Sequence, residues 1–211
     1  MSNLGTSNHL AQPGRRSPRL PRELICAIKG QQMPPSRLIL TISVAAQRMG
    51  LFEKIEDRAC RRAPSLGTTG SSFPQYRLRK EYLVSTSAYG IGQVVDSQQT
   101  PCGLHRVARK IGGGHPIGTV FRNRKVTGFT WQGLPDASIV HRIFWLEGLE
   151  PGRNRGGKVD TFSRYIYIHG FGDETTLGRP ASHGCIHLAA RDLIPLYDLL
   201  PVGSLVWIAE R

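Results

Sequence analysis

Short apolar runs, separated by turns rich in glycine and proline, are the feature that most constrains the fold of this chain. The 211 residues include 24 glycines and 14 prolines, which divide the sequence into short segments. β-Branched and aromatic residues dominate the segments between them, and such residues favour strands. The clearest predicted strands lie at 38–44, 82–92, 138–146, 164–170 and 204–210. Many short strands joined by turns predict a mainly β fold, either a sandwich or a barrel.

One helix is predicted near the C-terminus. Its apolar residues recur at helical spacing: Leu193, Leu196, Tyr197 and Leu200. Asp192 is placed to cap the helix, and Pro195 is expected in its first turn, where a missing N–H costs little. Pro201 and Gly203 are expected to end it. The apolar stripe predicts packing against the core rather than a binding face.

The composition changes along the chain and suggests its organisation. Residues 1–36 are rich in Pro, Arg, Ser and Gln, which predicts a basic, disordered tail. Residues 37–211 form the predicted domain, with an exposed loop insertion at 54–76. The longest apolar run, 38–46, is about half the length that a membrane-spanning helix needs. We therefore expect no transmembrane segment, and no clear signal peptide opens the chain.

The net charge of +13 comes from 28 basic and 15 acidic residues. Such a surplus favours anionic partners: nucleic acid, acidic lipid or a cell-wall polymer. No zinc-finger or RNA-binding signature is present, so no specific nucleic-acid binding is expected. The cysteines are widely spaced and contain no CxxC pair: Cys26, Cys60, Cys102 and Cys185. This spacing argues against a disulfide scaffold but leaves individual disulfides open.

Cys185 lies in a Ser-His-Gly-Cys turn with histidines nearby. A free thiol has a pKa of about 8.5, so a nucleophilic cysteine needs a base or a positive environment. His169, at the end of the predicted strand 164–170, and His183 are candidate bases. Gly184 permits unusual backbone dihedrals. The backbone N–H groups of Gly184 and Cys185 are therefore candidates for an oxyanion hole.

Two other interpretations of Cys185 remain open from the local chemistry. A cysteine is often a small buried apolar residue. Alternate residues of an extended segment share one face, so His183, Cys185 and His187 are possible zinc ligands together with His169. The His-x-Cys-x-His spacing is not a usual zinc pattern, but it does not exclude a metal.

Three segments together resemble the L,D-transpeptidase catalytic (YkuD) domain: 168–170, 181–188 and 202–208. In that family a histidine precedes Ser/Thr-His-Gly-Cys by a dozen or more residues, and here twelve residues separate His169 from Ser182. The resemblance covers about residues 37–209. It implies a mainly β, L,D-transpeptidase-like β-sandwich with one or two short helices.

The resemblance also implies roles for individual residues. Cys185 is expected to be the nucleophile and His169 the general base, with its ring oriented by the backbone carbonyl of Gly170. The expected oxyanion site and its supporting loop comprise Ser182, His183 and Gly184. His187 stands where the family often has Arg or Asn, and it is a possible substrate-binding residue. Neither a metal nor an organic cofactor is implied.

The implied reaction is acyl transfer on peptidoglycan. The thiolate would attack the third residue of a tetrapeptide stem, release D-alanine and form a thioester. An amine of a second stem would then give a 3→3 cross-link. Water as the acceptor would make the protein an L,D-carboxypeptidase, and a lipoprotein lysine is another acceptor. A cell-wall-binding module without turnover and a zinc-dependent hydrolase are the alternatives. The substrate implies the bacterial cell envelope, and the oligomeric state remains open.

Overall fold

The computed structural model describes residues 18–56 and 73–211. Its strands are β1 (Leu38–Ser43), β2 (Arg48–Lys54), β3 (Tyr76–Ser85), β4 (Gly103–Ile111), β5 (Thr119–Arg122), β6 (Lys125–Phe129), β7 (Val140–Gly148), β8 (Tyr167–Gly170), β9 (Ile186–Leu188) and β10 (Leu205–Ala209). The helices are α1 (Arg22–Gly30) and α2 (Ala190–Leu199), with 3₁₀ turns at Gly157–Val159 and Glu174–Thr176. The prediction of a mainly β fold with one or two short helices is confirmed.

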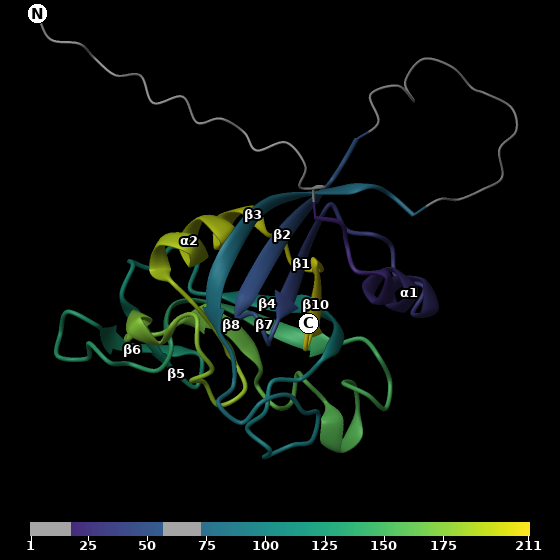
Figure 1. Cartoon of the computed structure of the whole chain (residues 1–211). Helices are drawn as coiled ribbons and strands as arrows, with labels where there is room; N and C mark the ends of the chain where they lie inside the picture. Colours follow the sequence, from purple (N-terminus) through teal and green to yellow (C-terminus); the bar gives the residue numbers. More distant parts are fainter. Residues whose placement is uncertain (1–17, 57–72) are drawn as a thin grey trace, which may run out of the picture.

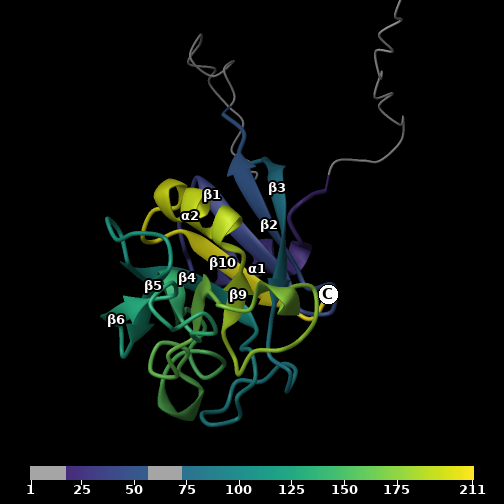
Figure 2. The same ribbon diagram turned by 90° about the vertical axis from the view of Figure 1, so that its left-hand side faces the viewer.

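The strands form one sheet that closes on itself. The neighbours run in the order β4-β10-β1-β2-β3-β9-β8-β7-β5-β6, and β4 also pairs with β7. This extra pairing joins the two ends of the run from β4 to β7, while the β5–β6 hairpin continues outward from β7. Figures 1 and 2 show the strands wrapping around a common interior, with α2 along one side. Closure protects the backbone groups of these strands, because no unpaired edge is left between β4 and β7.

Strand β1 is buried on both faces, which explains its nearly continuous apolar sequence. Leu40 and Ile42 point into the main core, which α2 also joins. Ile39 points to the opposite face and packs in a second cluster with residues of α1. An alternating polar pattern is absent here because each face of the strand meets another layer.

The prediction of a disordered tail is wrong for residues 22–30, which form helix α1. Leu24 and Ile28 are four residues apart, and both are almost fully buried against Leu104 and Trp207. Side chains at this spacing share one helix face, so a short stripe is enough to dock the helix. The composition of residues 1–36 is dominated by basic and polar residues, so it did not indicate these two apolar positions. Residues 1–17 of the predicted tail lie outside the described part of the chain.

Helix α2 begins three residues before the predicted start, with Ala189 rather than Asp192 at the N-cap position. Asp192 does not cap it but forms an ion pair with Lys80, with a distance of 2.8 Å between Oδ1 and Nζ. The N–H of Ala190 instead donates to Glu174 Oε1 at 2.6 Å. Pro195 consequently lies inside the helix rather than in its first turn. The predicted apolar stripe is buried as expected.

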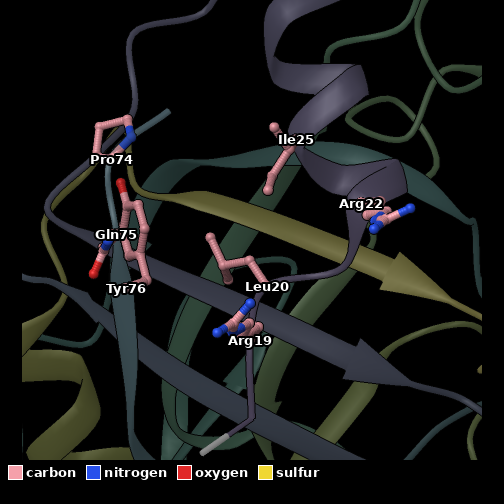
Figure 3. Close-up of a pocket in the computed structure, with 7 residues that line it drawn as sticks. All are labelled: Arg19, Leu20, Arg22, Ile25, Pro74, Gln75 and Tyr76. Carbon is pink, nitrogen blue, oxygen red and sulfur yellow. The ribbon is translucent and has the colours of Figure 1, made fainter. Parts of the chain in front are cut away.

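A cavity of about 370 Å³ lies between the approach to α1 and the start of β3. Figure 3 shows Leu20 and Ile25 on one side of it and Tyr76 on the other. The α1 side of the molecule is well separated from the β5–β6 hairpin (Figure 1). The predicted loop insertion 54–76 is bordered by the end of β2 and the start of β3, and its residues 57–72 lie outside the described ranges.

Candidate active site

Strands β8 and β9 bring the two halves of the predicted site together. They run parallel, with Ile168 paired to Ile186 and His169 paired to His187. Cys185 directly precedes β9, so it lies beside the strand that carries His169. The cysteine turn therefore leads into a short strand before α2 begins, rather than directly into the helix. Three residues are too few for a sequence pattern to identify such a strand.

The ring of His169 is buried and has a defined orientation. Its Nδ1 lies 2.7 Å from the carbonyl oxygen of Gly170, and the residue is 2% exposed. Because a carbonyl only accepts hydrogen bonds, Nδ1 carries the proton of the neutral ring and Nε2 keeps its lone pair. Burial lowers the pKa of His169 to about 4, although the Gly170 carbonyl opposes this shift. The neutral ring can therefore accept a proton through Nε2 at neutral pH.

Cys185 is a partly exposed residue, and two backbone groups contact its sulfur. The N–H of Tyr167 donates to Sγ at 3.4 Å, and Sγ lies 3.6 Å from the carbonyl oxygen of Tyr165. Burial raises the pKa of the Cys185 thiol to about 11, while the Tyr167 N–H and the charge of Arg164 act in the opposite direction. The resting cysteine is thus a thiol, and its backbone donor is placed to stabilise the anion during reaction.

Ser182 closes the cysteine turn through its hydroxyl group. Its Oγ donates to the carbonyl of Cys185 at 2.6 Å and accepts the N–H of Gly184 at 3.3 Å. The N–H of Gly184 is therefore not free for an oxyanion, contrary to the expectation from sequence. Within residues 18–56 and 73–211, no acceptor is bonded to the N–H groups of His183 and Cys185. These two groups are the available donors of the turn.

Gly184 is required by the shape of this turn. Its φ is +120°, a conformation that side chains disfavour. A Cβ at this position would lie 3.2 Å from Ile166 Cδ1 and 3.3 Å from the carbonyl oxygen of Gln99. The buried hydroxyl of Thr100 further fixes the turn by donating to the Gly184 carbonyl at 3.1 Å. Thr100 lies within residues 37–209, which the family resemblance covers, but no sequence pattern marked it as part of the site.

Arg164 is a second residue that the sequence did not indicate. Its guanidinium donates to the carbonyls of Gly92 at 3.1 Å, Gln93 at 2.9 Å and Gln99 at 2.7 Å, and to Ser97 Oγ at 3.3 Å. It thereby ties the loop containing these residues to the segment before β8. Its charge also favours the Cys185 thiolate. The acceptors are more than sixty residues away in sequence, so no local pattern predicts the contact.

His187 lies against the catalytic candidate rather than in open solvent. Its ring stacks on Phe171 at 4.4 Å between centroids and lies 4.9 Å from the ring of His169. Burial, together with His169 and His183, lowers the pKa of His187 to about 3. Its Nδ1 is buried and has no hydrogen-bond partner among the described residues. At 5% exposure, the residue offers little surface to a substrate.

His183 and the other candidate metal ligands do not converge on a common point among the described residues. His183 is exposed, with its ring 5.7 Å from that of Tyr89. In the part of the chain that the structure describes, no three His, Cys, Asp or Glu side chains are grouped to hold a metal ion. Cys26, Cys102 and Cys185 are free cysteines, and Cys60 lies outside the described residues.

Comparison with known families assigns the chain as a whole. Residues 39–208 match the L,D-transpeptidase catalytic domain, YkuD. The chain belongs to this family. No curated protein matches its sequence. Across the described ranges, no helix is long and apolar enough to cross a membrane.

Several solved structures are similar to this chain at low sequence identity. Bd1075 of Bdellovibrio bacteriovorus is 14% identical, with a TM-score of 0.49, over 83% of this chain and 49% of that one. L,D-transpeptidase 3 of Mycobacterium tuberculosis is 16% identical, with a TM-score of 0.46, over 82% of this chain and 61% of that one. An L,D-transpeptidase of Mycobacterium smegmatis is 12% identical, with a TM-score of 0.42, over 82% of this chain and 58% of that one. The chain thus spans about half to three fifths of their length.

Proposed function

We propose that the protein is a cysteine acyltransferase that cleaves the L,D bond of peptidoglycan tetrapeptide stems and forms 3→3 cross-links. Family membership supports this class of reaction. The observation that carries the proposal is the contact between His169 Nδ1 and the Gly170 carbonyl, on the strand next to Cys185. This contact leaves Nε2 as the only basic atom of the ring, which is the requirement for activating a neighbouring thiol.

Acylation begins with a neutral thiol and a neutral imidazole. As Sγ of Cys185 attacks the carbonyl carbon of the third stem residue, the thiol proton passes to Nε2 of His169. The carbonyl oxygen becomes an oxyanion that the N–H groups of His183 and Cys185 stabilise. When the tetrahedral intermediate collapses, the imidazolium returns the proton to the departing D-alanine nitrogen. The products are free D-alanine and a thioester on Cys185.

The second half of the reaction reverses these roles. An amine of another stem attacks the thioester, and His169 accepts its proton as the new amide bond forms. The departing sulfur is then reprotonated, which restores the neutral pair. Water in place of the amine follows the same steps and gives L,D-carboxypeptidase activity, and a lipoprotein lysine is a chemically equivalent acceptor.

A hollow beside the β5–β6 hairpin and the net charge of the chain favour a peptide substrate from the cell wall. A hollow of about 590 Å³ lies between the β5–β6 hairpin and residues 134–139. Phe121 and Ile139 line this hollow, and Phe121 belongs to an apolar cluster against which Ile139 and Cys185 both pack. The net charge of +13 suits a wall polymer rich in carboxylates. Such a substrate implies action in the bacterial cell envelope.

His187 is proposed to act through His169 rather than by contacting the stem. Its ring lies between Phe171 and His169, and a bulky neutral neighbour restricts the rotation of the His169 ring. The low pKa keeps His187 uncharged, so it does not compete electrostatically when His169 accepts a proton. His187 is thus a positioning residue in this proposal.

Incubation with disaccharide-tetrapeptide, followed by mass spectrometry, tests the proposed function. The wild type should release D-alanine and carry a thioester adduct on Cys185. Cys185→Ala should lose both signals, with a rate at least about a thousandfold lower because the nucleophile is absent. Cys26→Ala is the matched control, since Cys26 is a free, exposed cysteine on α1 and should be dispensable.

The products also separate the alternatives. A cross-linked dimer identifies an amine acceptor, and a free tripeptide identifies water. Turnover that survives Cys185→Ala contradicts the cysteine mechanism. Binding of the stem by the wild type without any D-alanine release would instead identify a wall-binding module.

A further inference from the structure

Arg124 occupies the tip of the β5–β6 hairpin in a conformation that usually belongs to glycine. β5 ends at Arg122 and β6 begins at Lys125, so the loop contains only Asn123, with φ 50°, and Arg124, with φ 65°. A two-residue hairpin loop with positive φ at both positions is a type I′ turn, in which Asn then Gly is preferred. Asn123 fits this preference, whereas Arg124 is strained. Strained residues of this kind gather at functional sites, which directs attention to the side chain.

The side chain of Arg124 lies over an aromatic cluster. Its Cζ is 5.1 Å from the centre of the Trp145 ring and 4.8 Å from that of Tyr165, and its Nη1 donates to the hydroxyl of Tyr167 at 3.3 Å. These contacts stabilise the cation but do not neutralise it. No carboxylate of the described residues forms an ion pair with it. The guanidinium is therefore an uncompensated charge held by three rings.

The same two tyrosines also contact the candidate nucleophile. The backbone N–H of Tyr167 and the backbone carbonyl of Tyr165 both meet Sγ of Cys185. Cys185 packs against the apolar cluster that includes Trp145 and Tyr167. The backbones of the tyrosines face the sulfur, and their rings face Arg124. Tyr165 and Tyr167 thus link the cation to the reacting sulfur, each contacting Arg124 through its side chain and Sγ through its backbone.

Another arginine near the sulfur is unsuited to bind a substrate anion. Arg164 already donates to four oxygen atoms of its own chain. Arg124 has a single recorded hydrogen bond, which uses one of the five N–H groups of a guanidinium. Its other donors are available to a carboxylate, which a guanidinium can bind through two parallel hydrogen bonds.

We propose that Arg124 binds the terminal carboxylate of the acyl donor, on the D-alanine residue that leaves. The inference rests on the proposed transferase function. In a tetrapeptide stem this carboxylate follows the scissile amide by one residue, or about 3.5 Å of chain. It is therefore the donor carboxylate nearest to the attacked carbonyl on the leaving-group side. Recognition at this point selects stems that end one residue after the cleaved bond.

Equilibrium binding to the Cys185→Ala variant tests the proposal without turnover. The ligands are disaccharide-tetrapeptide and the same molecule with a C-terminal amide, measured by titration calorimetry. The acid should bind about tenfold to a hundredfold more tightly than the amide, the range expected for hydrogen bonds to a charged group. Arg124→Gln should abolish this preference by weakening the binding of the acid and leaving the binding of the amide unchanged. Arg124→Lys should restore it in part, because a cation is retained.

Lys125→Gln is the matched control, because it removes one positive charge from an exposed neighbour on the same hairpin. It should keep the preference for the acid. Arg124→Gly suits the positive φ of the turn, so it tests the role of the side chain in a variant that the hairpin accommodates. It should lose the preference as Arg124→Gln does, while the cooperative thermal unfolding of the fold is retained.

The outcomes separate this inference from the transferase proposal. Equal affinity for acid and amide in Cys185→Ala overturns the role of Arg124, as does a preference that survives Arg124→Gln. Loss of affinity for both ligands alike shows a structural role and also overturns it. Thioester formation by the wild type is measured separately. A preference for the acid that depends on Arg124, without any thioester, supports the binding site and contradicts the transferase.

Discussion

Burial moves the pKa values of Cys185 and His169 in opposite directions. The thiol is raised to about 11 and the imidazole is lowered to about 4, so both groups are uncharged at neutral pH. A preformed thiolate–imidazolium pair would require these values to be reversed. In the proposed mechanism the proton therefore moves during the attack, when the Tyr167 N–H and the oxyanion donors stabilise the developing charges. At the scale of the residue, the proposed mechanism therefore uses His169 as a general base rather than as the partner of a permanent ion pair.

The pH dependence of alkylation tests the resting state of Cys185. Iodoacetamide reacts with the thiolate, so the labelling rate should rise steadily from pH 7 toward pH 11, following the raised pKa. Peptide mass spectrometry gives the rate for each cysteine, and the exposed Cys26 serves as an internal reference for the reagent. A labelling rate of Cys185 that is already high and constant below pH 7 would contradict a resting state with neutral Cys185 and neutral His169.

Helix α1 is the element whose contribution is least visible in the sequence. Leu24 and Ile28 dock it on the outer face of the barrel, beside Leu104 and Trp207. This face would otherwise expose the second side of β1 and β10. The helix is short and lacks a side-chain cap at Pro21, so packing rather than helix propensity stabilises it.

Leu24→Ala measures this packing directly. The substitution should lower the free energy of unfolding by about 3 kcal/mol, because it removes a fully buried side chain and leaves a cavity. Glu23→Ala, on the exposed side of the same helix, should change it by about 0.5 kcal/mol or less. Urea unfolding compares the two variants. Equal effects would mean that α1 does not pack on the barrel.

Buried neutral histidines couple the stability of the whole molecule to pH. Burial lowers the pKa values of His105 to about 3, His169 to about 4 and His187 to about 3. Unfolding returns each group to an ordinary value of about 6.5. Between these values the unfolded chain binds protons that the folded chain does not. Stability is therefore fully present above pH 6.5 and declines as the pH falls toward 4.

His105 offers the cleanest test of this coupling, because it lies outside the cysteine turn. It is fully buried and contacts Gly103 and Thr161 through its ring nitrogens. Between pH 6 and 4.5 the free energy of unfolding should fall by about 1.4 kcal/mol per pH unit for each buried histidine. His105→Gln should reduce the slope by about that amount, whereas His115→Gln, at an exposed position, should not. Urea unfolding at several pH values gives the slopes, and an unchanged slope in His105→Gln would contradict the assignment.

Local patterns predicted the features that depend on neighbours in the chain. The β-branched runs indicated β1, β7, β8, β10 and the end of β3, but not the nine-residue strand β4. The spacing from Leu193 to Leu200 indicated α2, and Ser-His-Gly-Cys with an upstream histidine indicated the candidate site. The short strands β5, β6 and β9 were not predicted, because three to five residues carry too little pattern for a prediction. Helix α1 was not predicted, because its buried face consists of only Leu24 and Ile28, and two apolar residues hardly change the overall composition of a basic segment.

The sequence by itself determined the mainly β class, the family and the identity of the candidate nucleophile and base. Only the tertiary structure decided which groups surround them. Glu174 rather than Asp192 accepts a backbone N–H at the start of α2, and Arg164 holds a loop more than sixty residues away. Arg124 donates to the hydroxyl of Tyr167, forty-three residues away. Strand β4 closes the barrel on β7 in the same way. The physical reason is common to all four: a hydrogen bond or a strand pair between distant residues requires their positions in space, whereas periodicity and motifs report only on residues close together in the chain.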